Sequence, residues 1–252
     1  MVANFQSENI DKVIEKLTDI IDTSIQTKSR QGYFAALYRK VTIRIKEGIA
    51  DNFFDNGERM ERFDMIFANR YLAAYETYQN HGKPSQSWQY AFQVDKQWWP
   101  IVLQHLLLGM NAHINLDLGI AAARVAPGEE LQNLRNDFNK INTILAELVG
   151  GVKEELAEIW PILRILNRYL GSVETALINF SMEKARDHAW SVAERLAPLP
   201  ESEQTDKINE MDAEMALFAR VIRYPGLIGS TVTKIIRLGE IGTIRKIIKI
   251  LE

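Results

Sequence analysis

Two side chains that can share chemistry, an imidazole and a carboxylate, lie four residues apart in the most apolar stretch of this sequence. His113 and Asp117 fall within Trp98–Arg124, which is hydrophobic around almost its whole circumference when drawn as a helix. At this spacing the two side chains share one helix face. There they can ligate one cation, or the carboxylate can orient the imidazole for general-base catalysis.

A bound metal usually needs three or four protein ligands, so further ligands must come from other helices. Asp64 lies inside an aromatic stripe, and His188 follows Asp187 on a later segment that also carries Glu183. We therefore predict a site for a divalent metal such as zinc, or a metal-free acid–base site, built from His113, Asp117, Asp64 and His188.

A purely structural role is the alternative. His113 and Asp117 can form a buried polar network with Arg70 or Arg124 that fixes the register of the helices.

A second polar pair in the same stretch leaves two interpretations open. Asn111 and Asn115 are also four residues apart, on another face from His113 and Asp117. Their amides can grip a ligand, or they can tie neighbouring helices together.

The elements that must position these side chains are helices. Apolar residues recur at helical spacing, and no strand-length alternation or internal repeat is present. We expect helices at 7–28, 33–50, 58–78, 98–124, 129–149, 152–170, 172–196 and 207–223, with a short aromatic helix after Ser85. Gly150-Gly151 should end one helix, Pro161 should kink or divide the next, and 198–206 should be a loop. The pattern predicts one all-α domain spanning residues 1–252, with about eight to ten helices packed around a buried central helix.

The segment 227–252 is amphipathic, with five basic and two acidic side chains among its isoleucines. It can dock on its own bundle, mediate a homodimer, or lie on an anionic membrane.

Aromatic side chains recur at helical spacing and can either fill the core or line an apolar ligand pocket. Among them Tyr71 is a candidate ligand-binding residue, together with Asn111, Asn115 and His188. The other members of the set are Tyr75, Tyr78, Trp88, Trp98, Trp99 and Trp190.

Composition excludes several classes of protein. A net charge of −3 and the lack of a basic arm argue against nucleic-acid binding. The absence of cysteine excludes disulfides and thiolate metal sites. The polar amino-terminal segment is not a signal peptide, and the central stretch carries too many polar residues for a membrane span. These features are typical of a cytoplasmic protein.

Three stretches together resemble an uncharacterised bacterial family of all-helical proteins. They are YRKVTIRIKEGI (38–49), RFDMIFANRYLAAY (62–75) and LLLGMNAHINLDL (106–118), of which the N-A-H-I-N-x-D-L core is the most distinctive. The family has no established activity. The resemblance therefore implies a shared site at Asp64, Asn111, His113 and Asp117 without naming a reaction.

A weaker similarity is to the helical zinc phospholipase C and P1-nuclease group, which also places an H-x-x-x-D pair on a core helix. This chain has only four histidines and no amino-terminal tryptophan ligand, so the similarity does not extend to a trinuclear zinc site.

The leading hypothesis is a small-molecule hydrolase. His113 would be ligand or general base, Asp117 its orienting partner, Asp64 a second carboxylate and His188 the partner from another helix, with water as nucleophile. The alternatives are a non-catalytic binder of an apolar ligand and a helical interaction or scaffold protein acting through residues 227–252.

Overall fold

Residues 8–159 and 182–252 are described by the structure, a computed structural model, and they contain helices but no strand. The α-helices are α1 (Ile10–Thr27), α2 (Gln31–Ala50), α3 (Gly57–Gln79), α4 (Gln86–Gln93), α5 (Val102–Ala112), α6 (Leu118–Val125), α7 (Leu131–Ile159), α10 (Met182–Leu196), α11 (Glu201–Arg223), α12 (Gly226–Gly239) and α13 (Ile244–Leu251). A π-helical turn, His113–Asp117, joins α5 to α6. The prediction of an all-α bundle is confirmed.

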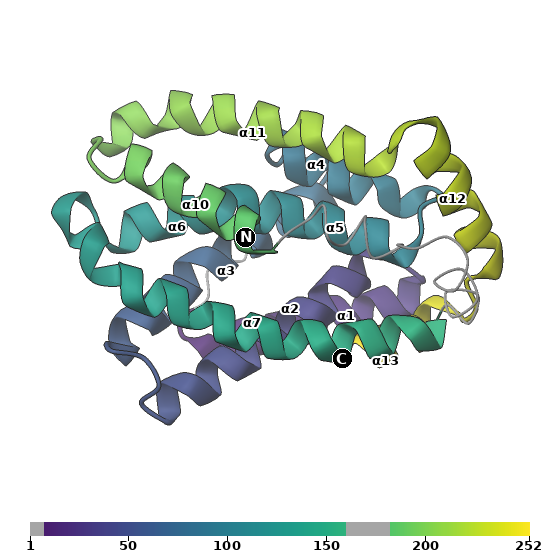
Figure 1. Cartoon of the computed structure of the whole chain (residues 1–252), viewed down its shortest axis with the longest axis horizontal. Coiled ribbons are helices and arrows are strands. Elements are labelled where there is room, and N and C mark those ends of the chain that lie inside the picture. The colour runs from purple at the N-terminus through teal and green to yellow at the C-terminus, as the bar shows by residue number, and fades with distance from the viewer. Residues whose placement is uncertain (1–7, 160–181) are drawn as a thin grey trace.

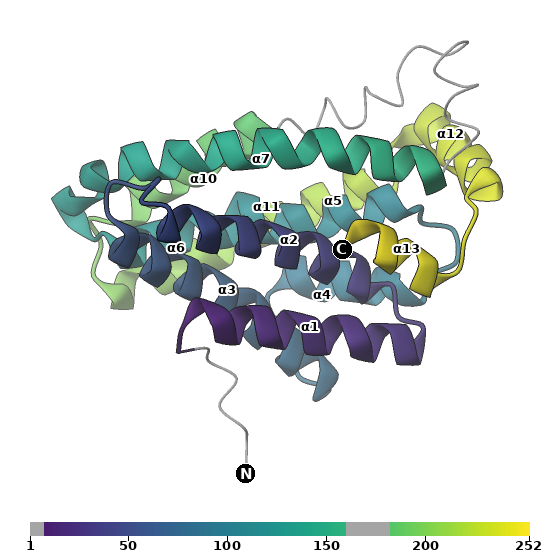
Figure 2. The ribbon, with the colours of Figure 1, turned by 90° about the horizontal axis from the view of Figure 1, so that it is seen from below.

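The rod formed by α5, the π turn and α6 runs through the middle of the bundle. In Figure 1 it lies between α11 on one side and α1, α2 and α7 on the other, and Figure 2 shows the same arrangement from below. Val102–Val125 is long and apolar enough to cross a membrane, but 89% of its apolar window is buried inside the structure. We therefore read it as the core helix of the bundle, as predicted.

The central helix begins later than predicted, at Val102 rather than near Trp98. Pro100 disfavours helical backbone in Trp99, and the backbone of Ile101 is extended (φ −80°, ψ 161°), so the predicted first turn at 98–101 does not form. The side chain of Gln104 then accepts a hydrogen bond from the Ile101 backbone N–H, at 3.3 Å, and caps the start of the helix.

Two predicted helix boundaries are wrong. α7 continues through Gly150-Gly151 to Ile159, since a glycine costs only about 1 kcal/mol inside a long amphipathic helix. Most of the predicted loop 198–206 belongs to the start of α11, with Pro200 at its N-cap position and acidic residues in its first turn. The predicted features at Pro161, Gly171 and Ser172 lie outside the described residues.

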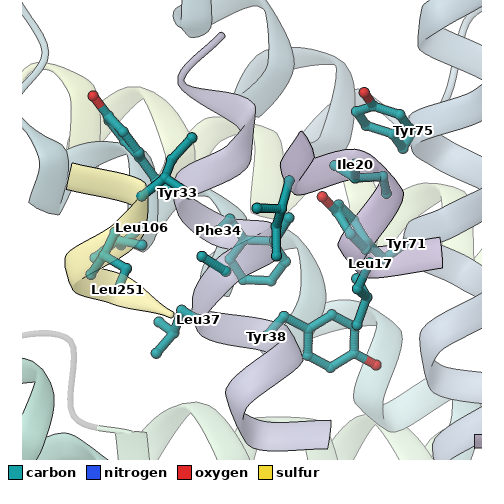
Figure 3. Close-up of a cluster of buried hydrophobic side chains, with 14 of the residues drawn as sticks. Leu17, Ile20, Tyr33, Phe34, Leu37, Tyr38, Tyr71, Tyr75, Leu106 and Leu251 are labelled. Atoms are coloured by element: carbon teal, nitrogen blue, oxygen red, sulfur yellow. The ribbon is translucent and has the colours of Figure 1, made fainter. Parts of the chain in front are cut away.

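The carboxy-terminal segment is divided between the core and the surface. Ile247, Ile248 and Leu251 of α13 are buried in the cluster that α1, α2 and α5 share. Figure 3 shows Leu251 beside Leu106 in this cluster. α12 buries Ile236 but leaves other apolar side chains exposed.

α10 packs closely against α6, the last helix of the rod. A Cβ added at Gly119 would lie 2.5 Å from the backbone oxygen of Ala189 and 2.7 Å from Cβ of Val192. Because a helix backbone cannot move aside as a flexible side chain can, Gly119→Ala should lower the free energy of unfolding by about 1–3 kcal/mol. Urea unfolding measures this change.

The control is Gly48→Ala, where an added Cβ would meet only side-chain atoms of Phe53 and Phe54, the nearest at 3.1 Å. Full stability of Gly119→Ala would show that the two helices are not in close contact.

Candidate functional site

Asp117 is the polar centre of the rod and joins three elements. Its Oδ1 accepts a hydrogen bond from Arg70 Nε of α3 at 2.5 Å, and its Oδ2 accepts one from Trp88 Nε1 of α4 at 2.7 Å. Only 1% of Asp117 is exposed. Burial by itself would raise the pKa of this carboxyl, but the Arg70 guanidinium and the indole N–H of Trp88 hold the pKa below its ordinary value. Asp117 is therefore an ionised, fully partnered carboxylate.

His113 is enclosed by aromatic rings. Its imidazole stacks on Phe67 with ring centroids 3.6 Å apart and an angle of 8° between the planes, and it meets Tyr38 edge-on at 4.4 Å. Nδ1 lies 3.6 Å from Asp117 Oδ2, too far for a hydrogen bond, and neither ring nitrogen has a hydrogen-bond partner in the described part of the chain. Burial lowers the pKa of His113, and Asp117 offsets this only in part. The imidazole is therefore neutral and closed off from solvent.

Asp64 is a buried carboxyl group, only 2% exposed. Among the residues that the structure describes, neither of its oxygens has a hydrogen-bond partner. Burial, followed by the negative charge of Glu61, raises the pKa of Asp64 to about 7. The hydroxyl oxygens of Tyr38 and Tyr71, whose rings contact each other, are also buried and have no hydrogen-bond partner among the described residues. Figure 3 shows both tyrosine rings packed in the apolar cluster.

The four predicted metal ligands do not come together. No group of three or more His, Asp or Glu side chains able to hold a metal ion occurs in the part of the chain that the structure describes. His188 is half-buried on α10, where burial and then Arg195 lower its pKa, and Asp187 beside it is exposed. The side chain of Glu183 lies outside the described residues. The geometry therefore does not support the zinc site, nor the similarity to the zinc phospholipases.

Asn111 and Asn115 are used within the protein. Asn111 Nδ2 donates to the backbone oxygen of Met215 on α11 at 2.8 Å, and Asn115 Nδ2 donates to Asn111 Oδ1 at 2.9 Å. Both residues are buried. The amide pair ties the rod to α11, which is the structural alternative rather than the predicted ligand-binding role.

The predicted aromatic set is divided. Tyr71 is fully buried, and Tyr75, Tyr78 and Trp88 pack around Phe92. Trp190 packs on Phe138, whereas Trp98 and Trp99 are exposed at the surface. Beside Tyr71 and His105 there is a cavity of only about 20 Å³, which suits a single water molecule. This cavity is too small for an organic ligand.

A larger cleft lies on the other side of Asp117, between α3, the start of α4 and α6. Its volume is about 550 Å³. It is lined on α3 by Ile66, Asn69, Arg70, Ala73, Ala74 and Thr77, and on the other segments by Pro84, Ser85, Trp88, Asp117 and Arg124. His113 and Asp64 are not among these lining residues.

Two arginines give the cleft its charge. Arg124 is 40% exposed, and its nearest carboxylate is that of Glu201, 4.0 Å away on a side chain that is 88% exposed. Burial and then the positive charge of Arg70 lower the pKa of Arg124. Arg70 and Arg124 therefore line the same space, and Asp117 binds only the guanidinium of Arg70 directly.

Sequence reasoning named Arg70 and Arg124 only as network partners and did not find this cleft. One signal was present in the stretch 66–77: small and polar residues follow one helix face (Asn69, Arg70, Ala73 and Thr77), where a packed face would carry larger apolar side chains.

Comparisons with known proteins are consistent with the resemblance inferred from the motifs. No curated protein and no solved structure matches the chain. A family model described as a family of unknown function (DUF5995) matches residues 10–225, and this range includes the rod, the cleft and Asp117. The chain belongs to this family of unknown function, DUF5995.

Proposed function

We propose that the protein binds a small organic anion, a carboxylate or a phosphate ester, in the cleft between Arg70 and Arg124. The observation that carries the proposal is the convergence of two guanidinium groups from different helices on one cleft. Guanidinium groups bind carboxylate and phosphate oxygens in pairs of parallel hydrogen bonds, so they are suited to such ligands.

The charge balance of the cleft favours an anion. Arg70 is compensated by the buried carboxylate of Asp117. Arg124 is left with a distant contact to an exposed glutamate, which water screens. An anion beside Arg124 would bring a countercharge to a guanidinium that burial and Arg70 both disfavour.

The other lining residues indicate an organic ligand rather than a bare ion. A volume of about 550 Å³ lies within the range of small-molecule sites. Ile66, Ala73, Ala74, Pro84 and Trp88 supply apolar surface beside the two guanidiniums. A ligand with one anionic end and a small apolar body would satisfy both parts of the cleft.

Binding is better supported than hydrolysis. His113, the predicted general base, is closed off by Phe67 and Tyr38 and does not line the cleft. Asp117 does line it, but Arg70 and Trp88 occupy its oxygens and its lowered pKa makes it a weak base. The apolar-ligand alternative requires an open interior, and the cavity beside the rings holds only about 20 Å³.

Arg124→Ala should weaken the binding of phenyl phosphate or benzoate at least about tenfold, since a charge-assisted hydrogen bond contributes about 1.5–3 kcal/mol. Isothermal titration calorimetry on the full chain, with inorganic phosphate as a third probe, gives the dissociation constants. The matched control is Arg62→Ala, which removes an exposed arginine of α3 that pairs with Glu58 and does not line the cleft.

Equal affinities for the Arg124 and Arg62 variants, or no binding of any probe to the parent protein, would refute the proposal. Turnover of phenyl phosphate by the parent, lost in Arg124→Ala, would instead favour the hydrolase hypothesis.

A further inference from the structure

α12 presents apolar side chains on two opposite faces. Its inner face buries Ile236, which is 1% exposed. Its outer face carries Leu227, Ile235 and Leu238, which are 91%, 44% and 73% exposed and lie at spacings of eight and three residues along one side of the helix. The inner face is part of the core, but the outer face has no packing partner among the described residues.

Two exposed tryptophans extend this outer face. The guanidinium of Arg237 lies 4.9 Å from the ring centroid of Trp98, and its Nε donates to the Trp98 backbone oxygen at 2.7 Å. Lys234 Nζ lies 5.8 Å from the ring centroid of Trp99. Both indoles are therefore held against α12, at the end of the bundle where Figures 1 and 2 place this helix. We call the exposed surface formed by these side chains the end face; its residues are Trp98, Trp99, Leu227, Ile235 and Leu238.

The carboxy-terminal segment that carries most of the end face exposes charges of one sign. Between residues 226 and 252 the exposed charged side chains are all basic: Lys234, Arg245, Lys246 and Lys249. The two acidic side chains of this segment are 1% and 14% exposed, and they are held in ion pairs by Arg237 and Arg39. The whole chain carries a net charge of −3, so positive charge is concentrated here against the overall balance.

We propose that the end face docks on an anionic lipid surface, with its leucines and tryptophans in the interfacial layer and its lysines and arginines over the headgroups. Tryptophan is enriched at membrane interfaces, and an apolar stripe bordered by basic side chains is typical of interfacial helices. A second copy of this chain is a poorer occupant, because a symmetric contact through this face would bring two positively charged surfaces together.

Vesicle flotation of the full chain tests the proposal. The protein should float with vesicles of phosphatidylcholine and phosphatidylglycerol in equal parts, and it should stay behind with phosphatidylcholine alone. Lys234→Glu changes the charge by two units, each worth roughly fivefold in partitioning, so binding should weaken roughly 30-fold. The double variant Leu227→Ser/Leu238→Ser should weaken it at least about tenfold.

Phe53→Ser is the control, since Phe53 is an exposed apolar residue of the loop between α2 and α3. Circular dichroism confirms that each variant is folded. The proposal is overturned if the parent does not float with anionic vesicles, if it floats equally with neutral ones, or if the Lys234 and Phe53 variants bind alike. A concentration-dependent dimer that the Leu227/Leu238 variant abolishes, without vesicle binding by the parent, would assign the end face to self-association instead.

Discussion

Asp64→Asn is expected to change the free energy of unfolding in a pH-dependent way. The variant should gain about 4 kcal/mol over the parent at neutral and alkaline pH, relative to the difference between the two proteins in acid. The carboxyl group is buried with no hydrogen bond to any residue that the structure describes, and its pKa is raised from 3.8 to about 7 by burial and by Glu61. The native state therefore keeps a proton that the unfolded chain releases. About three pK units at 1.36 kcal/mol each give the size of the effect.

The pH window follows from these two pKa values. Below pH 3.8 both states are protonated at Asp64, and its contribution to stability is fully present. Between pH 3.8 and about 7 the unfolded state binds fewer protons than the native state, so stability falls as the pH rises. Above about pH 7 the native state also ionises and the loss is complete. Asparagine has nearly the same shape but no charge, so the variant lacks this fall.

Urea unfolding of parent and variant across this range measures the difference in unfolding free energy. Glu61→Gln is the control: it removes only the smaller cause of the raised pKa, so the fall should persist with its upper end at slightly lower pH. The comparison with the parent is needed because His105 changes stability with pH in the opposite direction. Burial lowers the pKa of His105 to about 3, so its contribution to stability increases as the pH rises. Parallel curves for parent and Asp64→Asn would show that Asp64 has a hydrogen-bond partner or is hydrated.

The fold was largely predictable from the sequence because apolar periodicity reports which helix faces are buried. The order of the helices up to Gly150 and the burial of the rod both follow from that pattern. The π turn at His113–Asp117 was not predictable, since nothing in His-Ile-Asn-Leu-Asp distinguishes a π turn from an α-helix. A turn of this kind alters the geometry of side chains four residues apart, and His113 and Asp117 consequently do not form the expected hydrogen bond.

The candidate site was predicted at its centre but not in its extent. Asp117 was identified because a carboxylate in an apolar helix must meet a partner. Its partners come from 47 and 29 residues away, and a single sequence does not record which of several arginines and indoles packs there. The cleft depends on three separate segments leaving a space between them. No single position in the sequence encodes a cleft between segments, so only the coordinates reveal it.

Arg70→Met is expected to destabilise the protein by about 3–5 kcal/mol at neutral pH, because it leaves the Asp117 carboxylate buried without its cation. Methionine retains much of the apolar stem of arginine, so the loss is mainly electrostatic. The side chain of Arg70 is 20% exposed through the cleft, and water that enters there would bring the loss toward the lower figure.

A double-mutant cycle with Asp117→Asn isolates the pair. In the Asp117→Asn background no buried carboxylate is left without a cation. Arg70→Met should therefore lower the free energy of unfolding far less there. The coupling energy between the two residues should reach about 2 kcal/mol or more. The single-variant penalty should also shrink in acid. The lowered pKa of Asp117 means that its contribution is present above the unfolded pKa and is lost as the pH falls through the folded value.

The size of this coupling also bears on ligand binding in the cleft. Strong coupling means that Arg70 is committed to Asp117, so a bound anion would depend chiefly on Arg124 and would share only the outer N–H groups of Arg70. Coupling below about 0.5 kcal/mol, the level seen for independent sites, would mean that water from the cleft already solvates Asp117. Arg70 could then turn toward a ligand, and Arg70→Met would weaken phenyl phosphate binding as much as Arg124→Ala. Measuring unfolding on the four proteins of the cycle, and phenyl phosphate binding on these four and on Arg124→Ala, therefore decides whether Arg70 serves the fold or the ligand.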